Sequence, residues 1–194
     1  MEIFETIYIV GFVIALVIRS YYGKQFKRKE IEHSRKENPM VFVGMALWAV
    51  ALVSPFFIIF SDRLVMFDYE MVTSLRVIGA SIFVVSLWVL WRSHLDLSIN
   101  FSPSLFIRSN HKLITTGIYK KIRHPMYLSF FMWAIGQALL ITNWIAGPLG
   151  LIAFVFIYFF RVEREEQQLL DKFGKEYKLY QKETGRVLPR LTRD

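Results

Sequence analysis

Residues 128–160 read LSFFMWAIGQALLITNWIAGPLGLIAFVFIYFF and contain no Asp, Glu, Lys, Arg or His. A single helix over this stretch would be about 50 Å long, whereas the hydrocarbon core of a bilayer is about 30 Å thick. Thr142-Asn143-Trp144, followed by Gly147-Pro148, offers a place for the chain to turn back. The stretch therefore predicts a tight hairpin of two membrane helices, at roughly 126–141 and 144–160. Such a hairpin returns both flanking segments to the same side of the membrane.

Three further apolar runs approach the roughly 20 residues that a helix needs to cross a bilayer. They cover Ile3–Ile18, Pro39–Phe60 and Val72–Trp91. Hydrophobic residues make up 54% of the chain and aromatic residues 16%, which is more apolar than an ordinary soluble domain. We therefore expect an all-α polytopic membrane protein with about five transmembrane helices. Glu2 and Glu5 stand where a secretory signal peptide has positive residues, so no such peptide is expected.

Lys and Arg are unevenly distributed among the segments that separate the apolar runs. Seven lie in residues 19–37, six in 92–125 and nine in 161–194, against one in 61–71 and none in the 142–144 turn. Positive residues concentrate in the cytoplasmic loops of membrane proteins. We therefore expect the N-terminus outside, and the C-terminus and both segments that flank the hairpin in the cytoplasm.

Several classes of function receive no support from the sequence. The chain has no Cys, which excludes disulfides, thiolate metal sites and a Cys nucleophile. It has no phosphate-binding glycine loop and no serine-hydrolase or zinc-protease motif. His33, His94, His111 and His124 lack metal-ligand spacing, so no metal site is expected. The net charge of +8 lies in short loops, where it favours a role in topology over nucleic-acid binding.

Two polar motifs flank the predicted hairpin. Arg123-His124-Pro125 stands at a predicted helix start, where Pro suits the first turn and the helix N-terminus attracts anions. Arg161 and Glu165 are four residues apart, so they share a helix face as the second arm leaves the membrane. The first motif is equally compatible with a basic collar at the membrane interface. For the second motif the alternative is a surface ion pair, which would contribute little. Its place at the membrane boundary, opposite the first motif, favours a partly buried Arg and Glu that together hold a zwitterionic ligand.

The C-terminal segment continues with helical spacing. Apolar and aromatic residues recur at intervals of three and four, with lysines between them; they are Leu169, Leu170, Phe173, Tyr177 and Tyr180. This pattern predicts a cytoplasmic amphipathic helix that lies on the membrane surface or folds back over the bundle.

Taken together, the motifs resemble the isoprenylcysteine carboxyl methyltransferases. The block from His111 to Tyr127 has the pattern H-x-L-I…G-x-Y…R-H-P-x-Y, and the block from Arg161 to Pro189 has R…E-E…F-G-x-E-Y-x-x-Y…P. Related patterns occur in phospholipid-methyltransferase-like membrane proteins and, more loosely, in the C-terminal part of sterol reductases. The resemblance covers about residues 105–190. One departure is Ile118, where Pro often precedes the tyrosine.

The resemblance implies a set of contacts with S-adenosylmethionine, and with S-adenosylhomocysteine as the product. The residues are His111, Lys112, Leu113, Ile114, Tyr119, His124, Pro125, Met126, Tyr127 and Glu165. Arg161 falls where the family has an arginine that holds the substrate carboxylate, so Arg161 and Glu165 are the expected catalytic residues. The sequence leaves open how Arg164 and Glu166 share these roles.

The resemblance thus implies an S-adenosylmethionine-dependent membrane enzyme that methyl-esterifies the C-terminal carboxylate of a prenylated cysteine, with the lipidic substrate entering from the bilayer. Three alternatives remain: an amine or phospholipid head-group methyltransferase, an NADPH-dependent enzyme like the sterol reductases, and a non-catalytic membrane scaffold that keeps only the fold. We expect one integral membrane domain over residues 1–194. Its parts are a three-helix part, 1–104, and a cofactor-binding and catalytic part, 105–194.

Overall fold

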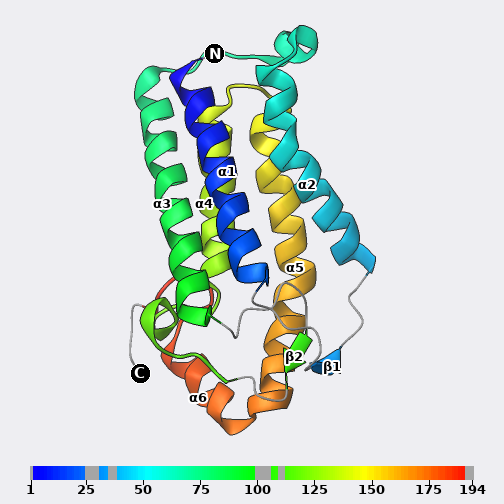
Figure 1. Cartoon of the computed structure of the whole chain (residues 1–194), viewed down its shortest axis with the longest axis vertical. Coiled ribbons are helices and arrows are strands. Elements are labelled where there is room, and N and C mark those ends of the chain that lie inside the picture. Colours follow the sequence, from blue (N-terminus) through cyan, green and yellow to red (C-terminus); the bar gives the residue numbers. More distant parts are fainter. Residues whose placement is uncertain (1, 25–30, 35–38, 99–105, 109–111, 191–194) are drawn as a thin grey trace.

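The computed structural model describes residues 2–24, 31–34, 39–98, 106–108 and 112–190. Its long helices form one elongated bundle (Figure 1). Their bounds are α1 Ile3–Lys24, α2 Pro39–Ile59, α3 Thr73–Leu97, α4 Pro125–Leu140 and α5 Ala146–Phe173. Shorter elements are the 3₁₀ turns η2 Asp62–Phe67 and η4 Gly117–Lys120, and the terminal helix α6 Lys175–Glu183.

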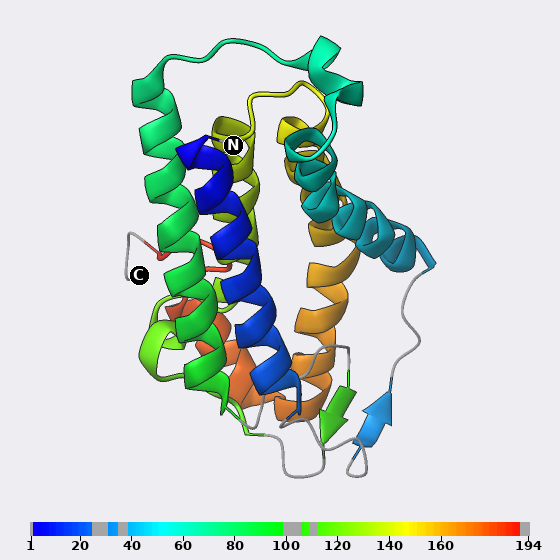
Figure 2. The same cartoon turned by 45° about the horizontal axis from the view of Figure 1, so that its top comes forward.

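The bundle is built around the contact between α3 and α4, the most extensive of the fold, with α1 packed mainly on α3. On the other side α5 packs on both α4 and α2, and α2 leans away from α1 (Figures 1 and 2). Glycines allow the close approach of α3 and α4. A Cβ at Gly136 would lie 3.0 Å from the Phe83 backbone, and one at Gly79 would lie 2.4 Å from the Leu139 Cβ. Small residues serve the same purpose in membrane helix pairs generally.

A buried polar residue joins four of these helices at the centre of the bundle. The Gln137 side-chain oxygen accepts hydrogen bonds from the Tyr8 hydroxyl at 3.1 Å and the Trp133 indole at 3.2 Å. Its amide nitrogen donates to the carbonyls of Ala51 at 2.9 Å and Ala146 at 2.7 Å. A polar side chain in an apolar bundle is costly unless it is satisfied. Gln137 therefore fixes how α1, α2, α4 and α5 meet.

The predicted hairpin is present as α4 and α5, joined by a short turn. Asn143 organises this turn, because its side-chain oxygen accepts hydrogen bonds from the amides of Ile145 and Ala146 at the start of α5. Its side-chain nitrogen donates to Asp68 at 2.6 Å and to the Leu64 carbonyl at 3.0 Å. One side chain thus satisfies free helix amides and holds η2 against the turn.

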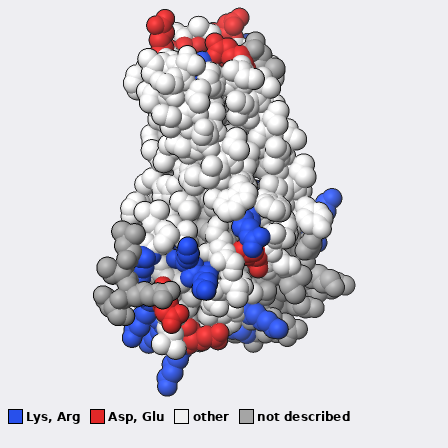
Figure 3. All heavy atoms as spheres, turned by 90° about the vertical axis from the view of Figure 1, so that its left-hand side faces the viewer, with Lys and Arg blue, Asp and Glu red and all other residues white. Residues whose placement is uncertain are grey.

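Four helices, α1, α2, α3 and α5, are long and apolar enough to cross a membrane, and α4 is a shorter apolar helix of 16 residues. Large hydrophobic side chains are exposed along α1, α2, α3 and α5, and Ile135 is exposed on α4. On the face drawn in Figure 3, charged side chains gather at the two ends of the bundle and an uncharged belt separates them. This surface is suited to lipid rather than to water.

Two features differ from the sequence prediction. The helix predicted to end its membrane crossing at Phe160 continues unbroken to Phe173 as α5 and stops at Gly174, whose φ of +54° lies in the left-handed region. The predicted amphipathic helix is thereby split, and only α6 follows the break. The strands β1 Ile31–Ser34 and β2 Phe106–Arg108 form a short antiparallel ladder that no sequence pattern indicated.

Candidate functional site

The two segments with polar motifs meet at one end of the bundle, as the hairpin predicts. Pro125 occupies the first turn of α4, as expected from the fixed φ of proline, and His124 stands at the N-cap position just before it. The polar motif of α5 lies beyond its apolar part, and α6 and the tail up to Arg190 return to the same end (Figure 1). We call this the hub end of the bundle, because several charged groups meet there on one residue, Glu166.

The side chain of Glu166 is only 8% exposed. It receives Arg123 Nε at 3.0 Å and His124 Nε2 at 3.2 Å on one carboxylate oxygen, and an Arg186 guanidinium nitrogen at 2.7 Å on the other. Burial alone would raise the pKa of the Glu166 carboxyl, but hydrogen bonds from His124, Arg186 and Arg123 lower it well below its usual value. Glu166 is therefore an anion held by three groups, and we call these four residues the Glu166 hub.

The hub fastens the C-terminal tail across the start of α4. The amides of Arg123 and His124 donate to the carbonyls of Gly185 and Arg186, both at 2.9 Å, and the Gly185 amide donates to the Lys121 carbonyl at 3.1 Å. The Arg123 guanidinium also donates to the carbonyls of Gln181 and Thr184. Backbone pairing and charge together make the tail part of this end of the molecule.

Glu165 has a different environment from its neighbour. Its carboxylate accepts a hydrogen bond from the Tyr127 hydroxyl at 2.5 Å, and its side chain is half-buried. The Tyr127 ring stacks on the His124 ring, with centroids 5.3 Å apart and planes 15° from parallel. Three residues that the sequence predicted as cofactor contacts are thus in one cluster, which we call the Tyr127 cluster: His124, Tyr127 and Glu165.

Arg161 lies one turn before Glu165 on α5 and is half-buried. The adjacent Val162 is buried against Tyr127 and Phe154, so this part of α5 faces the start of α4. Arg164 is exposed, which leaves Arg161 and Glu165 as the pair that faces the bundle. Glu166 is thus bound by groups of the protein, whereas Glu165 belongs to the Tyr127 cluster.

The remaining predicted residues are more dispersed. Tyr119 is buried, its hydroxyl donates to the Ser93 carbonyl at 3.4 Å, and its carbonyl accepts from the Tyr180 hydroxyl at 2.6 Å. Burial raises the pKa of the Tyr119 hydroxyl well above its usual value, so it is a neutral packed group. Pro125 is buried, Leu113, Ile114 and Met126 are half-buried, and Lys112 is exposed. His111 lies outside the described residues.

Sequence reasoning did not identify the partners of Glu166. Arg123 was noted as a possible anion contact, yet its guanidinium is committed to Glu166 and to the tail. Arg186 lies 20 residues from Glu166, a separation that no helical spacing rule connects. The sequence left the role of Glu166 open, and no pattern in it pointed to these partners.

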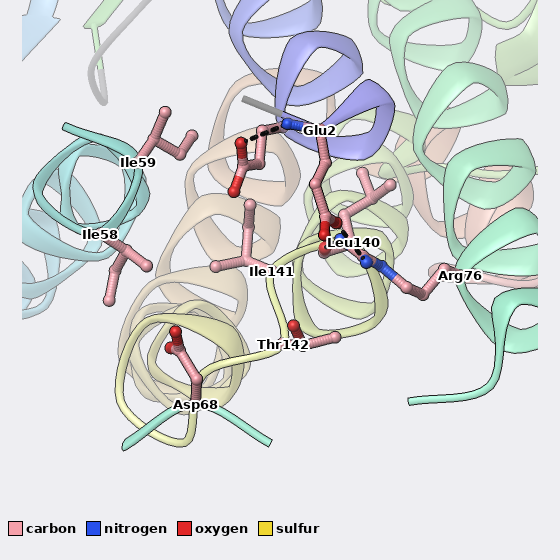
Figure 4. A pocket seen from close by; sticks show the side chains of 9 residues that line it. Glu2, Ile58, Ile59, Asp68, Arg76, Leu140, Ile141 and Thr142 are labelled. Atoms are coloured by element: carbon pink, nitrogen blue, oxygen red, sulfur yellow. Dashed lines mark hydrogen bonds and ion pairs between the residues drawn. The ribbon is translucent and has the colours of Figure 1, made fainter. Parts of the chain in front are cut away.

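A small polar pocket of about 110 Å³ lies at the opposite end of the bundle and is a separate feature. Arg76 spans it, pairing with Glu2 at 2.5 Å and donating to the Leu140 carbonyl at 3.2 Å (Figure 4). None of the predicted site residues lines it, and we call this end, with the 141–145 turn, the pocket end. In the parts of the chain that the structure describes, no group of three or more His, Asp or Glu side chains is arranged to hold a metal ion.

Comparison with known proteins gives one family. Residues 77–171 match the model of the isoprenylcysteine carboxyl methyltransferase family. The protein-S-isoprenylcysteine O-methyltransferase of Saccharomyces cerevisiae is 44% identical over 85 residues, or 42% of this chain and 34% of that protein. The Dictyostelium discoideum protein of the same name is 37% identical over 86 residues, which are 42% of this chain and 35% of that protein. The Mus musculus protein is 37% identical over 79 residues, which are 41% of this chain and 28% of that protein.

The chain spans about a third of the length of these curated relatives. One solved structure, that of the eukaryotic intramembrane Ras methyltransferase without a monobody, aligns with a TM-score of 0.55 at 24% identity. The alignment covers 80% of this chain and 54% of that chain, and it shows that the two share a fold. The chain is accordingly a multi-pass integral membrane protein.

Proposed function

Because the chain belongs to the isoprenylcysteine carboxyl methyltransferase family, we propose that it methylates the carboxylate of a lipidic acceptor, a prenylated cysteine, with S-adenosylmethionine as methyl donor. The observation that carries the proposal is the juxtaposition of Tyr127 and Glu165 at the end of the apolar bundle, beside Arg161 on the same helix face. In this proposal Tyr127 and Glu165 would hold the zwitterionic cofactor, and the neighbouring cation Arg161 would hold the anionic acceptor.

The chemistry of the Tyr127 cluster suits S-adenosylmethionine. Glu165 is a half-buried carboxylate whose one hydrogen bond among the described residues comes from Tyr127, so it can accept further donors such as an ammonium group. The Tyr127 ring, which stacks on His124, offers a π face that attracts positive charge. The cofactor supplies a methyl group on a positively charged sulfur. The exposed Lys112 and half-buried Leu113 and Ile114 would border its other parts.

The acceptor side rests on Arg161. A carboxylate is already ionised at pH 7, because reference pKa values lie near 3.5–4.3, so no strong base is needed. A guanidinium can hold it through two parallel hydrogen bonds while one oxygen displaces the sulfur at the methyl carbon. The charge of Arg19 on α1 is close enough to interact with that of Arg161. Two neighbouring cations at the edge of an apolar belt favour an anionic head group on an apolar tail.

The proposal includes five membrane crossings, with the N-terminus outside and the hub end in the cytoplasm. At 1.5 Å per residue the 16 residues of α4 span about 24 Å, which approaches the thickness of the hydrocarbon core. The parts 1–104 and 105–194 would form one domain, since α3 packs on α4 and α2 packs on α5 across the division.

Orientation can be tested with single cysteines, because the chain has none. We expect an impermeant thiol reagent to label Met66→Cys in intact cells and Lys175→Cys only after lysis, because Met66 is 81% exposed and Lys175 is exposed at the other end. The reverse pattern would place the hub end outside.

Methyl transfer to a defined acceptor tests the activity. The protein should transfer label from S-adenosylmethionine to an N-acetylated prenylcysteine, giving a product that releases methanol in base, because a carboxylate forms a base-labile ester. A prenylcysteine amide is the matched control and should be inert. Label on the amide, or only on amine-bearing lipids, would replace the proposal with head-group methylation, and binding of NADPH without S-adenosylhomocysteine would point to a reductase.

A further inference from the structure

The carboxylate of Asp96, in the last turn of α3, reaches the turn that carries Tyr119. Asp96 Oδ2 accepts a hydrogen bond from the Ile118 amide at 2.7 Å. The Asp96 carboxylate also pairs with Arg92 one turn earlier, at 2.9 Å and 3.2 Å, and its side chain is 10% exposed. No sequence motif singled out Asp96, and it lies upstream of both polar blocks.

The position of this carboxylate is unfavourable for the helix that carries it. A negative charge at a helix C-terminus opposes the helix dipole. Arg92 compensates, but an arginine four residues before an acid is the weaker of the two orders for such a pair. A residue at this place for helix stability alone would be basic or neutral. The stability of α3 therefore does not account for Asp96, whereas its hydrogen bond with the Ile118 amide does.

The turn is shaped to receive the carboxylate. Gly117, just before Ile118, has φ +61°, in the left-handed region that favours glycine. A Cβ at Gly117 would lie 2.1 Å from Asp96 Oδ2 and 2.4 Å from its Cγ, far inside van der Waals contact. The absence of a side chain at Gly117 therefore leaves the space that the Asp96 carboxylate fills.

The turn held by Asp96 lies between the 112–114 segment and Tyr119, both of which belong to the predicted cofactor contacts. Tyr119 in η4 is fixed to α3 through Ser93 and to α6 through Tyr180. The segment immediately before Gly117 contains Lys112, Leu113 and Ile114, the described residues proposed to border the cofactor. Asp96 makes a charged contact with the backbone between this segment and Tyr119.

We propose that Asp96 is a positioning residue, which fixes the 112–120 segment on the end of α3 and so sets the affinity of the site for its adenosyl ligand. This rests on the proposed function for the identity of the ligand, whereas the anchoring of the turn does not. Asp96 touches neither substrate nor the reacting atoms; it acts through Gly117 and Ile118.

The test combines ligand binding with a readout that needs no ligand. In Asp96→Ala we expect the affinity for S-adenosylhomocysteine, measured by calorimetry, to fall about tenfold, the scale of one charged hydrogen bond. Asp96→Asn keeps an acceptor for the Ile118 amide and should therefore retain most of the affinity for S-adenosylhomocysteine. Arg92→Ala is the matched control, since it removes the ion pair but not that hydrogen bond. The KM for the lipidic acceptor should stay within about twofold in all three.

Amide hydrogen exchange measures the anchoring directly. The peptide that covers 112–121 should exchange faster in Asp96→Ala, while the peptide that covers 125–140 keeps its protection. Gly117→Ala should produce the same change, and its effect should be smaller in an Asp96→Ala background because the clash partner is gone. Unchanged exchange in 112–121, or additive effects of the two substitutions, would overturn the proposal. If the unaltered protein bound no S-adenosylhomocysteine, the proposed function and the affinity claim would fall, and the exchange result would still decide the anchoring.

Discussion

The pocket end and the hub end both join distant segments through an ion pair, but they use their charges differently. At the pocket end one cation meets one carboxylate: Arg76 pairs with Glu2, whose side chain is 62% exposed, and a second guanidinium nitrogen donates to the Leu140 carbonyl at the end of α4. At the hub end three cationic or ionisable groups converge on Glu166, which is 8% exposed, while the adjacent Glu165 receives only the Tyr127 hydroxyl among the described residues.

This difference separates charges that hold the fold from charges that are available to a ligand. The groups that pair with Glu166 all belong to the protein itself. Replacing Glu166 should therefore lower the stability of the fold. Glu165 lies one residue away, half-buried against aromatic rings, and can accept more hydrogen bonds than the protein gives it. At the pocket end Asp68 accepts a hydrogen bond from Asn143, and Glu5 accepts one from the Glu2 amide.

The largest effect is expected from removing the hub carboxylate. Glu166→Ala leaves Arg123, His124 and Arg186 without their common partner, and breaking a buried ion network in this way costs about 3–5 kcal/mol. Thermal unfolding in detergent, followed by circular dichroism, should show a strong decrease in Tm. Glu163→Ala, an exposed acid on the same helix, is the control and should change stability by less than about 0.5 kcal/mol. Equal Tm values for the two variants would mean that the buried Glu166 stabilises the fold no more than the exposed Glu163 does.

The hub should also give the protein a stability that depends on pH. The pKa of Glu166 is lowered in the folded state, so its contribution is present above the unfolded pKa of about 4.3 and is lost as pH falls toward the folded value. Between pH 5 and pH 2 the Tm of the unaltered protein should therefore decrease more than that of Glu166→Gln, which has no carboxyl to protonate. Parallel pH profiles would mean that Glu166 titrates normally.

The pocket end should respond least. Its ion pair is partly exposed, and such pairs contribute about 0–1 kcal/mol, so Arg76→Ala should lower stability only modestly through that pair and the lost bond to Leu140. Binding of S-adenosylhomocysteine should be unchanged, because the pocket end lies at the opposite end of the bundle. A loss of ligand affinity in Arg76→Ala would show that the two ends are coupled.

Much of the fold follows from local signals in the sequence. The uncharged 128–160 stretch with its central turn predicts the hairpin, and Pro125 marks the start of α4, because hydropathy and proline geometry act over a few residues. Gly174 is a local stop signal as well, but the prediction carried one amphipathic helix across it.

The candidate site was predictable only in part. The family pattern brings Tyr127, His124 and Glu165 to attention, and the structure places them together. The partners of Glu166 and the anchor at Asp96 depend on how the tail and η4 pack on the bundle, and the β1–β2 ladder joins segments more than 70 residues apart. No spacing rule within one helix or strand reports such contacts.

The central claim is that the hub end holds the adenosyl ligand through Glu165 and the acceptor through Arg161. Calorimetric titration of S-adenosylhomocysteine into Glu165→Ala, Arg161→Ala and Arg76→Ala tests it most directly. Glu165→Ala should lose about 10- to 150-fold in affinity, the value of a charged hydrogen bond, while the other two bind as the unaltered protein does. Arg161→Ala should nevertheless have no methyl transfer activity. Equal loss of S-adenosylhomocysteine affinity in Arg161→Ala and Glu165→Ala, or full affinity in Glu165→Ala, would contradict the assignment.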